Sequence, residues 1–215
     1  MSKDCCSPTP SPETITPTDE RMWRLVLWFA FIINAIMFVA EFMSGVTAKS
    51  SALQADSLDF FSDAVNYGLS LGVASMALVW RNRIALFKGI TLGVFGVVII
   101  LNTVWQTYTG DVPIAPIMGT VALLALLSNA VVALMLFRFR KGDANMRSVW
   151  ICTRNDVIGN IAVLLAAMGV LSTGTGYPDY AVAFIMATLA LSGSWQIMRH
   201  ALAERKEMQT AAPTA

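Results

Sequence analysis

The sequence has little charge and almost no histidine. Only 13% of its 215 residues are charged, and His200 is the single histidine. A soluble domain of this length would carry about twice that share of charge. No basic cluster is large enough to bind RNA or DNA, so no nucleic-acid partner is expected. Apolar residues make up 56% of the chain, in long runs that predict membrane spans rather than one oversized core.

Cysteine is also scarce, which excludes a disulfide framework. Cys5 and Cys6 are adjacent and cannot easily bridge each other, and Cys152 lies far away in an apolar run. The first 20 residues are polar and lack the apolar core and cleavage site of a signal peptide. We interpret residues 1–20 as a disordered cytoplasmic arm in a reducing compartment.

Six apolar stretches are long enough, at roughly 20 residues each, to cross a bilayer as helices. They cover residues 23–45, 52–80, 86–108, 114–137, 148–172 and 178–199. Segments containing glycine and proline at 109–113 and 173–179 predict turns. The predicted fold is therefore all-α, a polytopic membrane protein with six transmembrane helices over 21–200. Residues 201–215 are expected to form a short cytoplasmic tail, with no soluble domain after it.

Basic residues are distributed unevenly between the ends of these spans. They flank the first span, follow the sixth, and lie between spans two and three and between spans four and five. The group between spans two and three consists of Arg81, Arg83 and Lys88. The opposite loops carry only Lys49. Because positive charge stays on the cytoplasmic side, both termini are predicted to be cytoplasmic.

Several acidic residues fall inside predicted spans, where a charged side chain is costly and marks function by default. They are Glu41, Asp56, Asp59, Asp63 and Asp156. Only Arg154 is a basic residue in a comparable position, and we expect it to extend to the cytoplasmic surface. Such an excess of buried acids requires protons or a cation to neutralise it.

Polar residues of the second span fall on one stripe of its helix. The stripe consists of Asp56, Asp59, Asp63, Asn66 and Ser70. Asp59 and Asp63 are four residues apart and project side by side, which forms half of a site for a divalent cation. Asp56 lies one turn farther out and is either an entry ligand or, as we favour, a helix-packing residue.

The fifth span repeats this arrangement, since Cys152, Asp156 and Asn160 recur every four residues. If the two stripes face each other, they supply four metal ligands: Asp59, Asp63, Cys152 and Asp156. Such a set suits tetrahedral coordination, and the sulfur favours Zn²⁺ or Cd²⁺ over Mg²⁺ or Ca²⁺. A small buried apolar residue is an equally good interpretation of Cys152.

Other polar residues are candidates for lining the pathway or supporting the ligands. They are Asn34, Glu41, Asp56, Asn66 and Asn160. Asn34 and Glu41 are seven residues apart and share a face of the first span. The sequence supports two roles for them equally, lining the pathway or bonding to other helices.

These motifs resemble the cation diffusion facilitator family. The run Asn34-x6-Glu41-x3-Gly45, followed by Ser51-Ala52-Leu53-Gln54-Ala55-Asp56-x2-Asp59-x3-Asp63, is similar to the family pattern in spans one and two. In span five, Cys152-x3-Asp156-x3-Asn160 is similar to the family's His-x3-Asp-x3-(Ser/Asn). The resemblance extends from Arg24 to Arg199.

The resemblance implies a secondary transporter that exports Zn²⁺, Cd²⁺ or a similar ion from the cytoplasm by proton antiport. It implies Asp59, Asp63 and Asp156 as ligands, with Cys152 where the family usually has His or Asp. No cofactor is expected besides the transported metal and the protons. The family's usual cytoplasmic metal-binding domain is not expected here, so a homodimer would form through the spans. The default location is the plasma membrane, which is the inner membrane in a Gram-negative bacterium.

Two other functions would use the same residues. A non-transporting sensor or buffer of metal would need the same ligands, and only a flux measurement separates it from a transporter. Membrane phosphatidyl-alcohol transferases also have about six spans and a metal motif that ends in Asp-x3-Asp. Their upstream pair of aspartates is missing, since only Glu41-x3-Gly45 stands there. We therefore favour a transporter over an enzyme.

Overall fold

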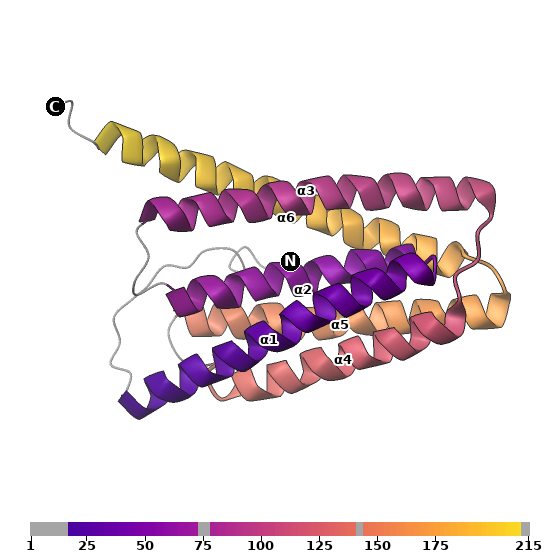
Figure 1. Ribbon diagram of the computed structural model, residues 1–215, viewed down its shortest axis with the longest axis horizontal. Coiled ribbons are helices and arrows are strands. Elements are labelled where there is room, and N and C mark those ends of the chain that lie inside the picture. The colour runs from indigo at the N-terminus through magenta and orange to yellow at the C-terminus, as the bar shows by residue number, and fades with distance from the viewer. Residues whose placement is uncertain (1–16, 73–77, 141–143, 212–215) are drawn as a thin grey trace.

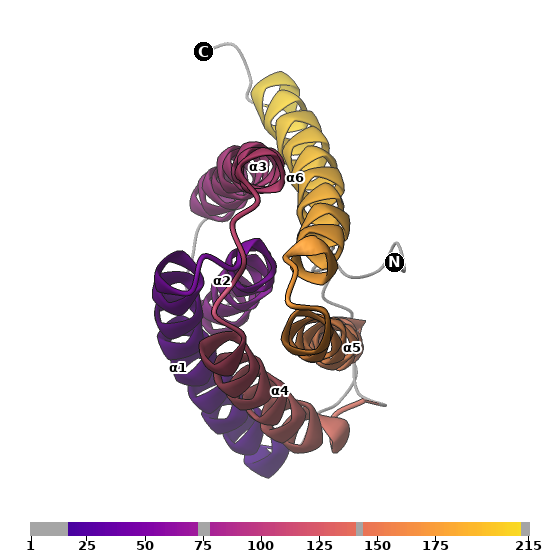
Figure 2. The same ribbon diagram turned by 90° about the vertical axis from the view of Figure 1, so that its right-hand side faces the viewer.

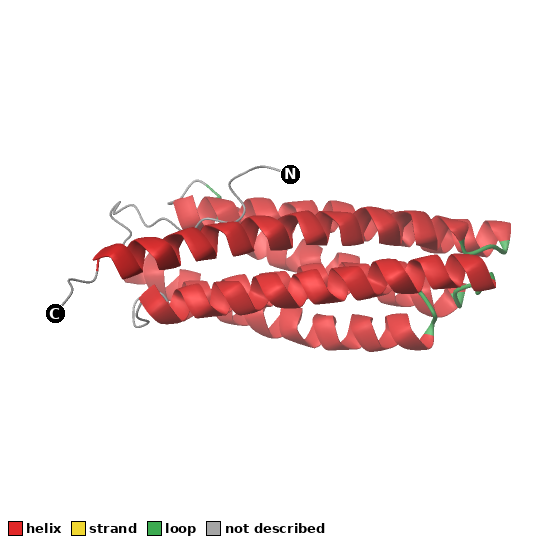
Figure 3. Ribbon diagram, turned by 90° about the horizontal axis from the view of Figure 1, so that it is seen from above, coloured by secondary structure: helices red, strands yellow, loops and turns green. Residues whose placement is uncertain are grey.

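The computed structural model describes residues 17–72, 78–140 and 144–211, and these form six α-helices without strands (Figure 3). The helices are α1 (Pro17–Thr47), α2 (Ser51–Gly72), α3 (Leu78–Thr109), α4 (Ala115–Phe137), α5 (Ala144–Thr173) and α6 (Tyr177–Ala211). The predicted all-α fold is confirmed. Residues 1–16, including Cys5 and Cys6, lie outside the described residues.

Successive helices run in opposite directions, so the bundle has two distinct ends (Figure 1). The start of α1 and the end of α6 lie at the same end. We call it the basic end because exposed arginines and lysines gather there, namely Arg21, Arg24, Arg83, Arg138, Arg199, Arg205 and Lys206. At the other end, short loops join α1 to α2, α3 to α4 and α5 to α6. Among the described residues of these loops, Lys49 alone is basic.

α2 lies inside the bundle and contacts each of the other five helices (Figure 2). Its residues 51–58 are all buried. The other five helices are each long and apolar enough to cross a membrane. α2 carries three aspartates, yet its 22 residues span about 33 Å, enough for a hydrocarbon core of about 30 Å. The chain is therefore a multi-pass membrane protein whose most acidic helix is surrounded by the others.

α3 and α6 pack along each other as a pair, and three glycines permit their close approach (Figure 2). A Cβ added at Gly89, Gly93 or Gly96 would lie 2.8–3.0 Å from a side-chain atom of α6. The Ser194 hydroxyl also donates a 2.6 Å hydrogen bond to the Gly89 carbonyl. Small residues of this kind let helix backbones approach closely in a membrane.

Several helix boundaries differ from the prediction. α1 begins at Pro17, before the predicted span and inside the segment 1–20 that is expected to be disordered. α3 begins at Leu78, before the break predicted at 81–85, because an apolar run through Trp80 hides where one helix stops and the next begins. α6 continues to Ala211 instead of ending at residue 199. Its extension is rich in Ala, Leu, Glu, Arg, Lys and Met, which are strong helix formers.

The two predicted turns are confirmed. They contain Gly110 and Gly174, which have φ values of 72° and 64°. Glycine adopts this left-handed conformation without the steric cost that a Cβ brings. These turns reverse the chain at the end opposite the basic end, and they set the antiparallel order of the helices.

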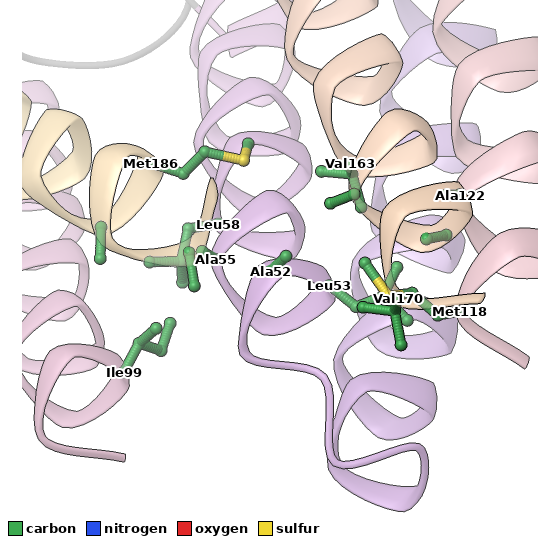
Figure 4. Packing of buried hydrophobic residues seen from close by; sticks show 14 of the residues in the cluster. Ala52, Leu53, Ala55, Leu58, Ile99, Met118, Ala122, Val163, Val170 and Met186 are labelled. Carbon is green, nitrogen blue, oxygen red and sulfur yellow. The ribbon is translucent and has the colours of Figure 1, made fainter. Parts of the chain in front are cut away.

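Buried apolar side chains form two clusters, one in each half of the bundle. The cluster farther from the basic end unites residues of α2 to α6 (Figure 4), including Ala52, Leu58, Ile99, Met118, Val163 and Met186. The cluster at the basic end includes Trp23, Leu27, Tyr67, Val132, Leu136 and Val149. On α2, Asp59 and Asp63 lie between Leu58, which belongs to the first cluster, and Tyr67, which belongs to the cluster at the basic end. A polar layer therefore crosses the bundle between two apolar ones.

Candidate metal site

The carboxyl groups of Asp63 on α2 and Asp156 on α5 lie close enough to interact within this polar layer. Two ionised carboxylates have only acceptor atoms and repel each other, so a proton or a cation between them would stabilise the pair. Asp63 is 5% exposed, and Asp156 Oδ2 has no donor among the described residues. Such a pair holds a proton or, once deprotonated, a cation between the two helices.

Tyr67 and Thr153 adjoin this pair on the side of the basic end. The Tyr67 hydroxyl donates a 2.6 Å hydrogen bond to Asp63 Oδ2 and lies 2.7 Å from Thr153 Oγ1. Both side chains are buried. Neither residue is among the predicted site residues. The signal for Tyr67 is its spacing, because it follows Asp63 by four residues and so lies on the same face of the helix.

The four predicted ligands form a column along the antiparallel helices α2 and α5. Asp59 lies one helical turn from Asp63, away from the basic end, and Cys152 lies one turn from Asp156, toward the basic end. Four residues of helix rise about 6 Å. Among the described residues, no three Cys, His, Asp or Glu side chains are grouped closely enough to hold a metal ion. The tetrahedral set stays a prediction, with Asp63 and Asp156 at its centre.

A second carboxyl pair joins Glu41 of α1 to Asp56 of α2, farther from the basic end. The two side chains are 0% and 2% exposed. Neither Glu41 oxygen has a donor among the described residues, and the same holds for Asp56 Oδ2. Glu41 and Asp56 thus contact each other between α1 and α2. The roles of both residues, in the pathway or in helix packing, stay predictions.

Lys88 is wrongly placed by the sequence analysis. The sequence analysis groups it with the basic residues between spans two and three, but it lies well inside α3 and is only 4% exposed. Its ammonium donates a 2.8 Å hydrogen bond to Asn66 Oδ1, and its charge acts on the carboxyl groups of Asp59 and Asp63. The bundle interior therefore holds a basic residue beside the acids. Arg154 is exposed, with its guanidinium 5.3 Å from the centre of the Trp150 ring.

Three buried asparagines extend the polar layer to α1, α4 and α5. Asn34, Asn129 and Asn160 are each at most 2% exposed. Oδ1 of all three, and Nδ2 of Asn160, have no hydrogen-bond partner among the described residues. A buried amide without a partner is costly unless water or a polar ligand reaches it. The sequence analysis does not select Asn129, although it is the one amide side chain of α4 and lies in a mostly apolar segment.

The end opposite the basic end is closed by Asp179, another residue that the sequence analysis does not select. Its buried carboxylate accepts hydrogen bonds from the Ser50 hydroxyl and from the backbone N–H groups of Ser51 and Ala52, at 2.6, 2.9 and 3.3 Å. The first turn of α6 thereby caps the start of α2. Nearby, Lys49 binds Asp111 at the surface, and its hydrogen bond lowers the pKa of that carboxyl.

A family model described as the cation efflux transmembrane domain matches residues 27–204. This chain belongs to the cation diffusion facilitator family. The matched range reaches into all six helices and contains both carboxyl pairs. The family resemblance of the motifs is therefore confirmed over most of the chain.

Curated relatives within this group are distant in sequence. The chain is 24% identical to "Zinc transporter ZitB" of Yersinia pestis over 211 residues, which cover 90% of this chain and 66% of that protein. It is 24% identical to "Metal cation efflux system protein CzcD" of Cupriavidus metallidurans, over 82% of this chain and 60% of that protein. It is 22% identical to the "Cadmium, cobalt and zinc/H(+)-K(+) antiporter" of Bacillus subtilis, over 83% and 62%. The chain spans less than two thirds of the length of each of these relatives.

Proposed function

We propose that this protein exports divalent transition-metal ions, Zn²⁺ or Cd²⁺, from the cytoplasm in exchange for protons. The observation that carries the proposal is the proximity of the Asp63 and Asp156 carboxyl groups, which we infer share a proton, in a polar layer with apolar clusters on both sides. Only deprotonated carboxylates bind a metal, so an ion that enters this layer releases the proton. Protons that arrive from the other side then compete the metal off.

We assign the metal first to Asp63 and Asp156. Asp59 and Cys152 approach it from the adjacent turns of α2 and α5. A rocking motion of the helices against one another would open this layer to each side of the membrane in turn. The Cys152 thiolate favours softer ions, so Zn²⁺ and Cd²⁺ are the preferred substrates over Mg²⁺.

The names of the relatives support this substrate class. Zinc appears in the name of the Yersinia protein, and cadmium, cobalt, zinc and protons appear in that of the Bacillus antiporter. Membership in a family of transporters favours transport over the lipid-transferase alternative. A metal sensor or buffer that does not transport is the remaining alternative, because it would use the same ligands.

We further propose that the basic end faces the cytoplasm, which would put both termini there and the protein in the plasma membrane. The exposed cluster of arginines and lysines at this end supports that orientation. A homodimer through the transmembrane helices is the expected assembly. Reporter fusions at the C-terminus test the orientation, and light scattering of the purified protein tests the dimer.

The deciding experiment is the uptake of Zn²⁺ and Cd²⁺ into proteoliposomes under a pH gradient, with Asp156→Asn alongside the wild type. Asp111→Asn is the matched control, since it makes the same change at a surface carboxyl. Uptake that collapses with the gradient and is lost only in Asp156→Asn supports the proposal. Stoichiometric metal binding without uptake would make the protein a sensor or buffer instead.

A further inference from the structure

Lys88 has an unusual environment for a lysine. Among the side chains whose burial is described, it is the one basic side chain that is buried. It lies on α3, and its Nζ is 2.8 Å from Asn66 Oδ1 on α2. A lysine is almost never fully buried unless it is paired, because removing the ammonium from water is costly. A neutral amide can orient this ammonium but cannot neutralise it.

The neutralising partners are carboxyl groups of the proposed metal site. The Lys88 charge acts on Asp59 and on Asp63, the two aspartates that share a face of α2. Asn66, which accepts the hydrogen bond from Lys88, follows Asp63 by three residues and Asp59 by seven on the same face of α2. The positive charge therefore lies beside the α2 half of the site.

We propose that Lys88 is the protein's own counter-cation for Asp59 and Asp63, and that a bound divalent ion takes its place. Without metal, the ammonium offsets one of the two negative charges that these carboxylates carry when both are ionised. When the metal binds, a fixed positive charge remains close to a divalent ion and repels it. Lys88 thereby weakens metal binding and speeds release, which prevents the ion from staying trapped in the polar layer. This inference rests on the proposed function, because it concerns the same site.

The alternative is that Lys88 only joins α3 to α2 through its hydrogen bond to Asn66. Two variants separate charge from hydrogen bonding. Lys88→Gln retains an N–H donor for Asn66 without the charge, and Lys88→Arg retains the charge. If the charge of Lys88 is what matters, Lys88→Gln binds metal more tightly and releases it more slowly than the wild type. Lys88→Arg then has nearly the same metal affinity and release rate as the wild type. If only this hydrogen bond matters, Lys88→Gln binds metal no more tightly than the wild type.

The test is titration of the purified full chain in detergent with Zn²⁺ and with Cd²⁺, at fixed pH and ionic strength, followed by uptake into proteoliposomes. For Lys88→Gln we expect a Kd lower by about tenfold or more, and lower KM and kcat. For Lys88→Arg we expect a Kd within about threefold of the wild type. A thermal melt of each variant confirms that it is folded. A folded Lys88→Gln with an unchanged or weaker Kd overturns the inference.

The two proposals fail in different ways. If the wild type transports metal but Lys88→Gln leaves Kd unchanged, the counter-cation is wrong and the transporter stands. If the wild type binds metal without transporting it, a lower metal Kd in Lys88→Gln still supports the role of Lys88 as a counter-cation, at a site that binds metal but does not transport it. If neither protein binds metal, both proposals are overturned.

Discussion

Tyr67 donates a 2.6 Å hydrogen bond to Asp63, the residue one helical turn before it on α2. The same hydroxyl lies 2.7 Å from Thr153 on α5. Tyr67 also belongs to the apolar cluster at the basic end, so it is the point where that cluster meets the proposed metal site. A side chain in this position holds Asp63 in place and separates it from the basic end of the bundle.

We therefore expect Tyr67→Phe to slow metal uptake and to lower thermal stability. The ring still fills its place in the cluster, but the hydroxyl that connects Asp63 to Thr153 is gone. A hydrogen bond of this kind contributes about 1.5–3 kcal/mol when one partner is charged. Uptake into proteoliposomes and a thermal melt in detergent measure the two effects. Tyr108→Phe is the matched control, because Tyr108 is 87% exposed; equal effects of the two substitutions would remove Tyr67 from the site.

Asp63→Asn and Asp156→Asn should abolish uptake without unfolding the protein. Two adjacent buried carboxylates repel each other unless they share a proton, as we propose for this pair, and an amide supplies a donor in the same place. Each single variant should therefore melt at or above the wild-type temperature, while its metal binding is lost because one ligand charge is missing. A variant that melts well below the wild type would contradict the shared proton. Retained uptake would remove that residue from the ligands.

Cys152 is predicted to set the preference among ions. Replacing it with serine leaves a side chain of similar size but removes the soft sulfur ligand. We expect Cys152→Ser to lose more Cd²⁺ uptake than Zn²⁺ uptake, and Cys152→His to shift the preference toward Zn²⁺. Competition of the two ions in one uptake assay gives the ratio directly. Were the ratio the same in all three proteins, Cys152 would be a packing residue of α5.

The acidic face of α2 is predictable from the sequence for a physical reason. Aspartates at helical spacing in an apolar segment have few explanations, because each intramembrane charge is costly. Membership in the family and the helical architecture follow from the same motifs. The contact of Asp63 with Asp156 agrees with the predicted facing of the two stripes, although spacing alone does not say which residues of two antiparallel helices lie level with each other.

Lys88, Thr153 and Asp179 are not predictable in the same way. Lys88 falls at the edge of the predicted third span, but its burial and its contact with Asn66 depend on how α3 packs against α2. Thr153 has an unremarkable side chain whose role depends on Tyr67, a residue 86 positions earlier in the chain. Asp179 lies next to a turn, where an aspartate is common and usually solvated. Each of these roles is created by contacts between helices, which a single sequence does not display.

Asp179 should matter for stability rather than for ion preference. It is fully buried at the end opposite the basic end and accepts three hydrogen bonds at the start of α2. Each bond to a charged acceptor contributes about 1.5–3 kcal/mol. An asparagine at this position would place its own NH₂ group against one of the N–H or O–H groups that now donate to the carboxylate. Asp179→Asn should therefore melt at a clearly lower temperature, with the Zn²⁺ to Cd²⁺ uptake ratio unchanged in the protein that remains folded. Asp111→Asn, at an exposed ion pair at the same end, should leave the melting temperature as it is. If the two variants melted at the same temperature, the cap on α2 would not contribute measurably to stability. A changed Zn²⁺ to Cd²⁺ uptake ratio in Asp179→Asn would instead place this carboxylate on the exit route of the metal.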